Sequence, residues 1–519
     1  MNDSRLSRLD EQRVRIENPY GIPANLFAQS DVPVENRAVT ELLELLELSQ
    51  TIERFAEVDP EAFDVTPSLE RVAVTPDFHK AQGIPVGTVL QTRGFIVPQA
   101  IGSDVNCGMR LHLTGLNANH VSDNLDKLET VFRSLFFEAG RSIPMTRSQR
   151  EGLFLNGLEG LLEATPKNLE TGLWKLFQGA NVGTDLERIE SRGSQRAAQV
   201  FGLDDFLGPR GSRKPDGSGV NGEYSRDAQI GSIGGGNHFV EIQRVEKILD
   251  RGIAHAWGIK LGMVTVMVHT GSVGIGHLCG SVYREVVRQV YPHVLKHPKN
   301  GIFVLPSGEK HLGLQNVFWD ALANAANFAF ANRLFLGLMA VQGLQSVLGE
   351  FEFPLLYDAP HNLVWRDAED DQTFVHRKGA TTARGLEAMQ NTPFAFTGEP
   401  VLVPGSMGSS SYIMAGQGLP EALSSASHGA GRALARGAAT RGFDAEFKRF
   451  LEEFRVVTPL DLRRQDVKMR RDILDKKLEE LKREAPHAYK GIGPVIRTLE
   501  GAGMARAVAE LSPIMTIKG

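Results

Sequence analysis

The sequence has little cysteine, no long apolar run and no large excess of charge of one sign. Its two cysteines, Cys107 and Cys279, form no CxxC pair, which argues against a disulfide framework and favours a reducing compartment. Because no run of about 18 apolar residues is present, we expect no membrane-spanning helix. The opening stretch MNDSRLSRLDEQRVR is too polar for a secretory signal, so we expect a cytoplasmic protein. A formal net charge of −5 argues against a generally basic nucleic-acid binder but allows a local basic groove.

The first 200 residues change in character along the chain. Residues 1 to 70 are predicted to be an N-terminal helical segment, because AVTELLELLELSQTIERF repeats leucine at helical spacing. Residues 71 to 115 have the pattern of short strands broken by glycine and proline, and residues 120 to 200 are predicted to be mainly helical. The Gly- and Arg-rich stretch GPRGSRKPDGSGVNGEYSRD then predicts a loop.

The middle of the chain alternates strands with helices. Apolar β runs lie beside glycine-rich turns in QIGSIGGGNHFVEIQRV and GMVTVMVHTGSVGIGH, whereas SVYREVVRQVYPHVL and ALANAANFAFANRLFLGL have helical patterns. A dense run of charges near 445–485 predicts a solvated helical insertion. Residues of chemical interest recur from 77 to 519. We therefore predict a mixed α/β (α+β) fold with one catalytic domain over 71–519 and its cleft at the strand ends.

Several strand-like runs end in side chains that can bind a metal ion. The residues are Asp104, Cys107, His238, His269 and His361. A single histidine at a strand end is more often a hydrogen-bonded structural residue. Together, however, these side chains offer oxygen, sulfur and nitrogen donors, which suit Mn²⁺, Zn²⁺ or Co²⁺ better than Ca²⁺ or Mg²⁺. A thiolate can also bridge two metal ions, an arrangement suited to phosphoryl transfer.

A second feature is the stretch SSASHGAGR, which places His428 among small residues with Arg432 four positions later. An isolated match of this kind usually marks a surface loop or a helix start. Small neighbours would also let a nucleotide approach the ring. GGGNHFVE resembles a phosphate-binding nest, and VLVPGSMGSSSYIM offers Ser406 and Ser411 in a second such loop. The GK[ST] of a P-loop is absent and GSVGIG lacks the spacing of GxGxxG, so neither a Walker NTPase nor a Rossmann fold is predicted.

In this order, the motifs resemble the RtcB family of RNA-splicing ligases, from about residue 71 to the final IKG. The resemblance rests on ten collinear strings: SDVNCGMRL, GSIGGGNHFVEIQ, VHTGSVGIGH, NAANFAFANR, YDAPHNLV, HRKGAT, VPGSMGSSSYIM, SHGAGR, EAPHAYK and IKG. One such string carries little information, but ten in the same order are highly specific.

The resemblance implies a role for each residue of the site. His428 would attack the α-phosphate of GTP and carry a histidine–GMP adduct, while the five strand-end residues would hold two Mn²⁺ ions bridged by Cys107. The implied guanylate contacts are Asn237, Glu241, Asn362, Ser406, Ser411, Gly429, Ala430, Gly431 and Lys518. Arg432, Arg377 and basic residues of the 208 to 226 loop are expected to contact RNA phosphates, because guanidinium pairs with phosphate oxygens.

The activity implied by the resemblance is GTP- and Mn²⁺-dependent RNA ligation. RNA ends that carry a 3′-phosphate or a 2′,3′-cyclic phosphate would be joined to 5′-hydroxyl ends through a GMP-activated RNA 3′ end. The family makes tRNA splicing and RNA repair the expected processes. It also suggests an archease-type activator as a partner.

The sequence departs from the family pattern in a few places. Val273 stands where the strand-end turn usually reads GSRG, Lys80 and Ala81 alter the turn after TPDFH, and Pro360 precedes the metal-site histidine. None of these changes removes a metal or guanylate residue. Loss of the arginine at Val273 does remove an expected phosphate contact, so RNA-end specificity is the property in question.

Three other functions remain open at this level. A metal-dependent cyclic-phosphate hydrolase would keep the metal centre but would not need the guanylate residues. A non-enzymatic RNA-binding paralogue predicts erosion of the metal ligands, and the sequence has all five. An end-capping enzyme would transfer GMP to a nucleic-acid end without sealing it, and the change at Val273 keeps this alternative open.

Overall fold

An eight-stranded sheet forms the centre of the fold. The computed structural model describes residues 4–81, 83–138, 143–167, 172–180, 182–200, 224–226 and 230–519. The strand order is β13 (Leu355–Pro360), β7 (Gly108–Asn117), β11 (Met263–Thr270), β10 (Phe239–Ile248), β21 (Ala505–Ile517), β18 (Ser411–Gly416) and β17 (Pro400–Val403). These strands pair antiparallel, and β20 (Arg455–Val457) lies parallel to β21. β11 is buried along nearly its whole length, which explains its uninterrupted apolar sequence.

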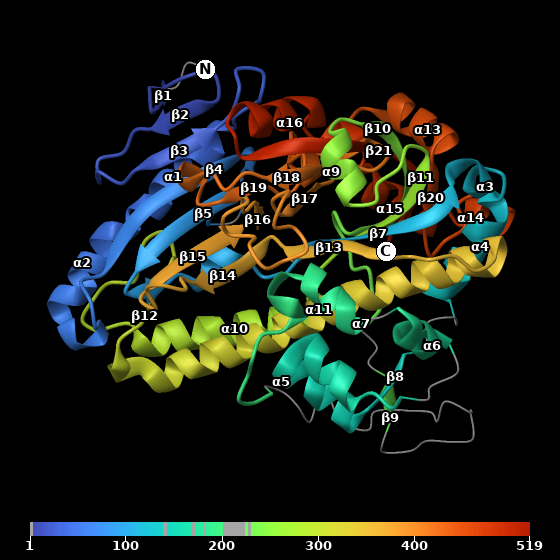
Figure 1. Cartoon of the computed structure of the whole chain (residues 1–519). Helices are drawn as coiled ribbons and strands as arrows, with labels where there is room; N and C mark the ends of the chain where they lie inside the picture. The colour runs from blue at the N-terminus through green and yellow to red at the C-terminus, as the bar shows by residue number, and fades with distance from the viewer. Residues whose placement is uncertain are drawn as a thin grey trace.

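A seven-stranded sheet lies beside it (Figure 1). Its strand order is β1 (Leu6–Arg8), β2 (Arg13–Ile16), β3 (Ala24–Phe27), β4 (Ser68–His79), β5 (Val86–Arg93), β15 (Thr373–Lys378) and β14 (Asn362–Arg366). The strand β3 pairs parallel with β4, and the other neighbours pair antiparallel.

The N-terminal part of this sheet corrects the sequence prediction. Helices α1 (Asn36–Leu46) and α2 (Leu48–Val58) confirm the leucine-rich helical pattern. A helical segment over all of residues 1 to 70 is wrong, because residues 6–27 contribute three strands to the sheet. These strands are only three or four residues long, which is too short for alternation of apolar and polar residues to identify them.

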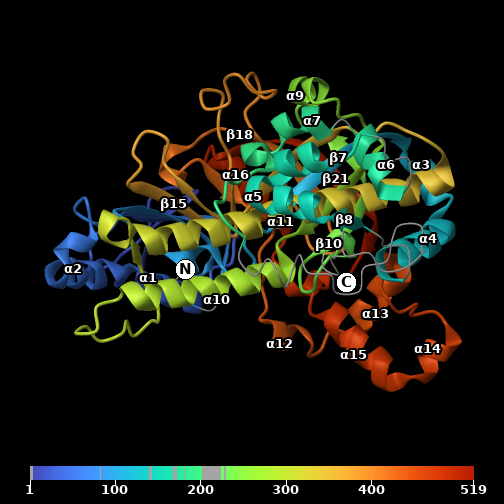
Figure 2. The same ribbon diagram turned by 90° about the horizontal axis from the view of Figure 1, so that it is seen from below.

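A 37-residue helix, α11 (Leu312–Leu348), runs along the sheets together with α10 (Val273–Val290), as Figures 1 and 2 show. The middle of α11 is buried on all sides, as expected for a helix enclosed by other elements. It packs against α10, against α5 (Arg147–Ala164) and against β11. Among the residues that the structure describes, no helix combines the length and the apolar character needed to cross a membrane.

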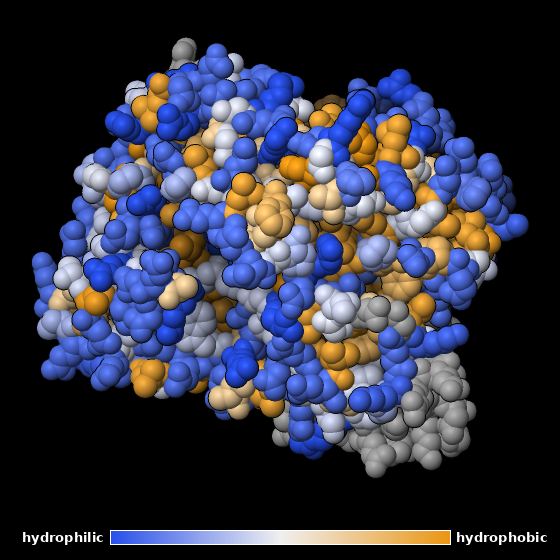
Figure 3. All heavy atoms as spheres, in the orientation of Figure 1, coloured by the Kyte–Doolittle hydropathy of each residue, from blue (hydrophilic) through white to orange (hydrophobic). Residues whose placement is uncertain are grey.

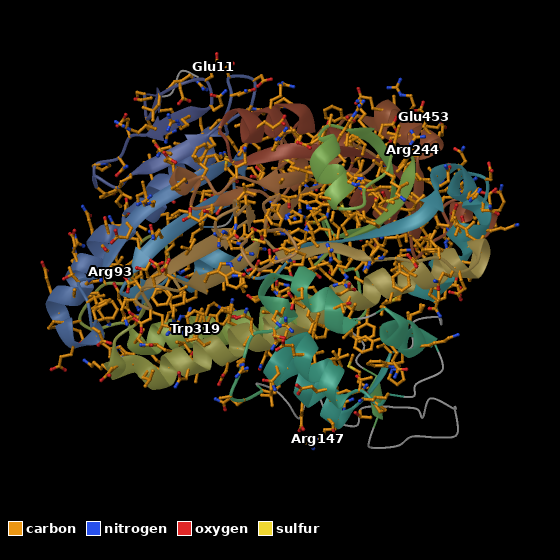
Figure 4. All side chains as sticks on the ribbon, in the orientation of Figure 1. Glu11, Arg93, Arg147, Arg244, Trp319 and Glu453 are labelled. Atoms are coloured by element: carbon orange, nitrogen blue, oxygen red, sulfur yellow. The ribbon has the colours of Figure 1, made fainter. Side chains whose placement is uncertain are left out.

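The charged stretch near 445–485 forms helices, as predicted. They are α13 (Asp444–Glu453), α14 (Gln465–Met469) and α15 (Arg471–Lys482), and they project from one side of the molecule in Figure 2. One segment between them, β20, joins the eight-stranded sheet instead. Hydrophilic residues dominate the face shown in Figure 3, and the labelled side chains of Glu11, Arg93, Arg147 and Glu453 lie at the periphery in Figure 4.

Candidate active site

Four consecutive strands of the eight-stranded sheet bring the histidine and cysteine candidates together. Cys107 directly precedes β7 and His238 directly precedes β10, whereas His269 lies near the end of β11 and His361 follows β13. Because neighbouring strands run in opposite directions, the end of one strand lies beside the start of the next. In the β10–β11 pair, His269 lies opposite Phe239, the residue after His238.

The donor atoms form two groups that share Cys107. Its Sγ lies 3.2 Å from His238 Nε2 and 3.4 Å from His269 Nε2. The Nε2 atoms of His269 and His361 are 3.3 Å apart, and His238 Nε2 is 2.8 Å from Asp104 Oδ2. Cys107, His269 and His361 therefore make one triad, and Asp104, Cys107 and His238 make the other.

The geometry of these groups fits divalent metal ions. Ligands at 2.0–2.3 Å from a tetrahedral ion lie roughly 3.3–3.8 Å apart, close to the observed spacings. Asp104 Oδ1 is buried and has no hydrogen-bond partner among the described residues. Gly271 permits the close approach of this carboxylate, since a Cβ at that position would lie 2.3 Å from Asp104 Oδ1. One thiolate shared by two triads can serve two ions.

The electrostatics of the donors support the same interpretation. Burial lowers the pKa of His269 and of His361 well below the usual value, so both imidazoles keep a free lone pair. Burial raises the pKa of Asp104, but attraction to His238 outweighs it and leaves the pKa below its usual range. Burial, together with the neighbouring Asp104 carboxylate, raises the pKa of the Cys107 thiol well above its usual value. Metal binding would therefore release a proton from this thiol.

His428 lies next to this donor set. It follows β19 (Ser425–Ser427), which pairs with β16 (Ala380–Thr382), and its ring centroid is 4.7 Å from that of His361. Its Nδ1 is 2.5 Å from Asp77 Oδ2, and Asp77 also accepts a hydrogen bond from Thr75 Oγ1 at 2.5 Å. Burial raises the pKa of Asp77, but attraction to the His428 ring and the hydrogen bonds from His428 and Thr75 bring it below the usual value. An ionised Asp77 holds the proton of His428 on Nδ1, which leaves the Nε2 lone pair available.

The small residues after His428 are required by packing as well as by access. At Gly431, where φ is +74°, a Cβ would lie 2.3 Å from the carbonyl oxygen of Asp77. At Gly429 a Cβ would come within 3.2 Å of the carbonyl oxygen of Pro404. Both glycines therefore let the chain lie close to the strand that carries Asp77 and to the 404–411 loop.

These residues enclose a cavity of about 300 Å³. The metal candidates and His428 line it, as do most of the predicted guanylate residues: Asn237, Asn362, Ser406, Gly429, Ala430, Gly431 and Lys518. Lys518 follows β21, and its Nζ donates to the carbonyl oxygens of Gly236 and His238 at 2.5 and 2.9 Å. Burial lowers the pKa of Lys518 to about 8. The central position of β21 thus brings the last lysine of the sequence to the site.

Two of the predicted guanylate residues do not line this cavity. Glu241 accepts hydrogen bonds from Thr516, which does line the cavity, and from Gln243 at 2.8 Å. Gln243 also donates to Ser411 Oγ at 3.0 Å. Glu241 and Ser411 therefore lie in a buried network behind Thr516. Burial raises the pKa of Glu241 to about 7.

The two predicted phosphate-binding arginines are held by the protein itself. Arg432 lines the cavity, but its guanidinium donates to Glu484 at 3.1 Å and lies over the ring of Tyr489 at 5.0 Å. Arg377 is not among the residues around the cavity; it is buried and donates to Ser425 Oγ at 2.9 Å. Of the 208 to 226 loop, residues 208–223 lie outside the described residues.

Three residues of the site were not predicted from the sequence. Asp77 is the partner of His428, and His79 and Lys378 both line the cavity. Burial lowers the pKa of His79 to about 4 and that of Lys378 to about 8. The signal in the sequence was weak, because a lone aspartate in TPDFHKAQGIPVG has the appearance of a turn residue.

Two of the departures from the family pattern are Val273 and the turn at Lys80 and Ala81. Val273 begins α10 with φ of +49°, and it does not line this cavity or the larger cavity that adjoins it. The turn at Lys80 and Ala81 is held by α1 and its N-cap, since their backbone N–H groups donate to Glu35 and Glu41 at 3.1 and 2.9 Å.

A second cavity of about 910 Å³ adjoins the first. His79, Val86, Gly102, Ser103, Lys378, Arg432 and Arg436 line both cavities. The second cavity adds Lys80 and Arg284, and among the described residues its lining includes one carboxylate, that of Glu35. It is therefore a basic hollow that leads to His428, in a chain whose net charge is negative.

The arrangement as a whole suits transfer of a nucleotidyl group. A histidine with one free nitrogen can act as the nucleophile, and two adjacent cation sites can neutralise charge on a phosphoryl group. The enclosed cavity can hold a nucleotide, and the basic hollow can hold a second phosphorylated substrate.

Comparison with known proteins agrees with this chemistry. The sequence model of the family described as "tRNA-splicing ligase RtcB" matches residues 63–519. The tRNA-splicing ligase RtcB of Thermococcus kodakarensis is 30% identical over 99% of both chains. The corresponding protein of Pyrobaculum aerophilum is 30% identical over 96% of this chain and 97% of its own, and that of Archaeoglobus fulgidus is 31% identical over 86% and 87%.

Proposed function

Because the chain belongs to the RtcB family of tRNA-splicing ligases, we propose that it joins RNA 3′-phosphate or 2′,3′-cyclic phosphate ends to 5′-hydroxyl ends. The cofactors of this reaction are GTP and two Mn²⁺ ions. The observation that carries the proposal is His428, held by Asp77 through Nδ1 and adjacent to His361 of the donor set.

In the first step His428 acts as the nucleophile. Its Nε2 lone pair forms a bond to the α-phosphorus of GTP, the bond from that phosphorus to the bridging oxygen breaks, and pyrophosphate leaves. Asp77 stabilises the resulting imidazolium through the Nδ1–H hydrogen bond. Asp104, Cys107, His238, His269 and His361 would hold the two metal ions, which would supply positive charge to neutralise the transferring phosphoryl group.

In the later steps the guanylyl group passes to RNA. An oxygen of the RNA 3′-phosphate attacks the GMP phosphorus, and the P–N electron pair returns to His428. The 5′-hydroxyl then attacks the activated 3′-phosphate, forming the phosphodiester bond and releasing GMP. A cyclic end is first opened by water to the 3′-phosphate. We propose that the basic second cavity, with Lys80 and Arg284, takes one of the RNA strands.

The lining of the first cavity supports a guanylate site. We assign guanylate binding to Asn237, Asn362, Ser406, the 429–431 backbone and Lys518. Glu241 and Ser411 support this site from behind Thr516, whose hydroxyl donates a hydrogen bond to one oxygen of the Glu241 carboxylate. Arg432 would contact an RNA phosphate in competition with Glu484. The proposal places the catalytic cleft at the strand ends of one catalytic domain over 71–519.

The test is incubation of the protein with α-³²P-GTP and Mn²⁺, followed by denaturing electrophoresis and treatment with acid or alkali. An acid-labile, alkali-stable label that is absent from His428→Ala supports the histidine–GMP intermediate. A label that persists in His428→Ala would place the nucleophile elsewhere.

RNA with defined ends separates ligation from the alternatives. Joined RNA supports ligation, whereas a 3′ end that retains GMP identifies an end-capping enzyme. Opening of a cyclic phosphate with no protein label identifies a hydrolase. Turnover measured with and without an archease-type protein tests the proposed activator.

A further inference from the structure

Arg333 lies in the middle of α11 and is buried completely beneath the donor set. Its Nη1 donates to the carbonyl oxygens of Asn106 at 2.6 Å and of Thr270 at 3.2 Å. Its Nε pairs with Asp358 Oδ1 at 2.7 Å. One guanidinium therefore contacts three separate segments of the chain.

Each of these segments carries a metal candidate. Asn106 immediately precedes Cys107, Thr270 immediately follows His269, and Asp358 is on β13, which leads into His361. The contacts of Nη1 with the first two segments are made with backbone carbonyl oxygens, so they fix the path of the chain, and Nη2 also donates to Asn106 Oδ1 at 3.4 Å. Cys107, His269 and His361 thus all belong to segments that contact the rigid guanidinium of Arg333.

The Asn106 position needs such support. Asn106 has φ of +56°, a left-handed conformation that L-residues adopt at a cost. Its side chain donates to the carbonyl oxygen of Ala326 on α11 at 2.6 Å, and its backbone N–H donates to the Asn362 carbonyl oxygen at 2.8 Å. The helix therefore holds the turn that presents Cys107 through both Arg333 and the Asn106 side chain.

Stability alone does not explain a buried arginine at this place. The desolvation of a buried ion pair offsets much of its attraction, and apolar replacements of such pairs are often as stable. Arginine has a planar fork of donors with fixed geometry, which lysine lacks. This rigidity is what three chain segments at fixed mutual distances require.

We propose that Arg333 is a positioning residue that preorganises the Cys107–His269–His361 triad before metal binds. It does not touch a ligand atom, and its effect passes through Asn106, Thr270 and Asp358. This proposal rests on the metal centre of the proposed function and adds to it the group that sets the spacing of the donors.

The matched control is Arg110, which is equally buried and pairs with the other oxygen of Asp358 at 3.1 Å. Its Nε donates to His112 Nε2 at 2.9 Å, and within the described part of the chain it has no hydrogen bond to Asn106 or Thr270. Arg333→Lys and Arg110→Lys therefore both keep a positive charge beside Asp358, but only the first removes the guanidinium that bonds the carbonyl oxygens of Asn106 and Thr270.

The experiment is titration of the metal-free wild-type protein and both variants with Co²⁺, followed by the visible bands and the thiolate-to-cobalt charge-transfer band. Loss of a group that orients metal ligands typically weakens metal binding by about 10–100-fold. We expect a loss of this size, with altered bands, for Arg333→Lys, and wild-type bands for Arg110→Lys. Unchanged binding by Arg333→Lys, or equal losses in the two variants, would overturn the proposal.

A measurement on the wild-type protein covers the case in which Arg333→Lys does not fold. In the metal-free state, the amides of Asn106 and Cys107 should exchange with deuterium as slowly as those of β11. Fast exchange in the metal-free state would show that metal, not Arg333, organises the turn. If the wild-type protein binds neither Co²⁺ nor Mn²⁺, the proposed metal centre fails as well, which distinguishes the two failures.

Discussion

Replacing Asp77 by asparagine tests how His428 becomes a nucleophile. The carboxylate accepts from His428 Nδ1 at 2.5 Å, and an asparagine amide could instead donate to that nitrogen. The proton would then move to Nε2, which is the nitrogen that attacks GTP in the proposed mechanism. In a histidine–aspartate pair of this kind, the wrong tautomer lowers the rate by about 10⁴-fold, or about 5 kcal/mol of transition-state stabilisation.

The assay is single-turnover formation of the protein–GMP adduct from α-³²P-GTP at saturating Mn²⁺. We expect a rate reduced by about 10³–10⁴-fold in Asp77→Asn, with metal binding retained, because Asp77 is outside both donor triads. Thr75→Val is the control, since it removes the hydrogen bond to the other carboxylate oxygen and leaves the carboxylate facing His428. A rate for Asp77→Asn within about threefold of the wild-type rate would refute this account of tautomer control.

Four further variants and one control have defined outcomes. Cys107→Ala should abolish binding at both triads, measured by Mn²⁺ titration calorimetry, whereas Cys279→Ala should bind normally because that thiol lies outside both triads; a metal-replete Cys107→Ala would contradict the assignment. His428→Ala should bind Mn²⁺ but form no covalent GMP. Glu241 has a folded-state pKa of about 7 against 4.5, so the folded protein holds its proton longer than the unfolded chain, and its contribution to stability falls as pH rises between these values. The free energy of unfolding of Glu241→Gln, measured in urea relative to wild type, should therefore rise by on the order of 3 kcal/mol from pH 4 to pH 8. A difference between the two proteins that does not change with pH would exclude this cause. Val273→Gly should stabilise the fold by about 1 kcal/mol in the same assay, because it relieves a left-handed β-branched residue; a loss of stability would show that the side chain contributes more than the strain costs.

The sequence predicted the parts of the fold that have strong local patterns. The leucine repeat of α1 and α2, the apolar run of β11 and the helical pattern of α11 each bury a long face, so periodicity or composition identifies them. Strands β1, β2 and β3 were missed because they are short and rely on pairing with one another and with β4.

Only those site residues that lie within a sequence motif could be predicted. Each string names its own residues but not the partner that another segment supplies. Asp77 and His428 are 351 positions apart, and no spacing rule connects them. Arg377 shows the opposite problem, because a guanidinium expected at RNA phosphate is enclosed by its neighbours in the fold. Which charges remain accessible is a property of tertiary packing.

The position of β21 also bears on how the protein is made. Glu241 of β10 contacts Thr516 of β21 across 275 positions of sequence, and Lys518 completes the cavity. Contacts between residues so distant in sequence form slowly, because the entropy of closing a long loop is lost before the contact stabilises the fold. During translation, β10 therefore cannot pair with β21 until nearly the whole chain has been made. A chain that stops before this last strand has His428 but lacks Thr516 and Lys518 of the cavity, so under the proposed mechanism an unfinished product of synthesis would be inactive.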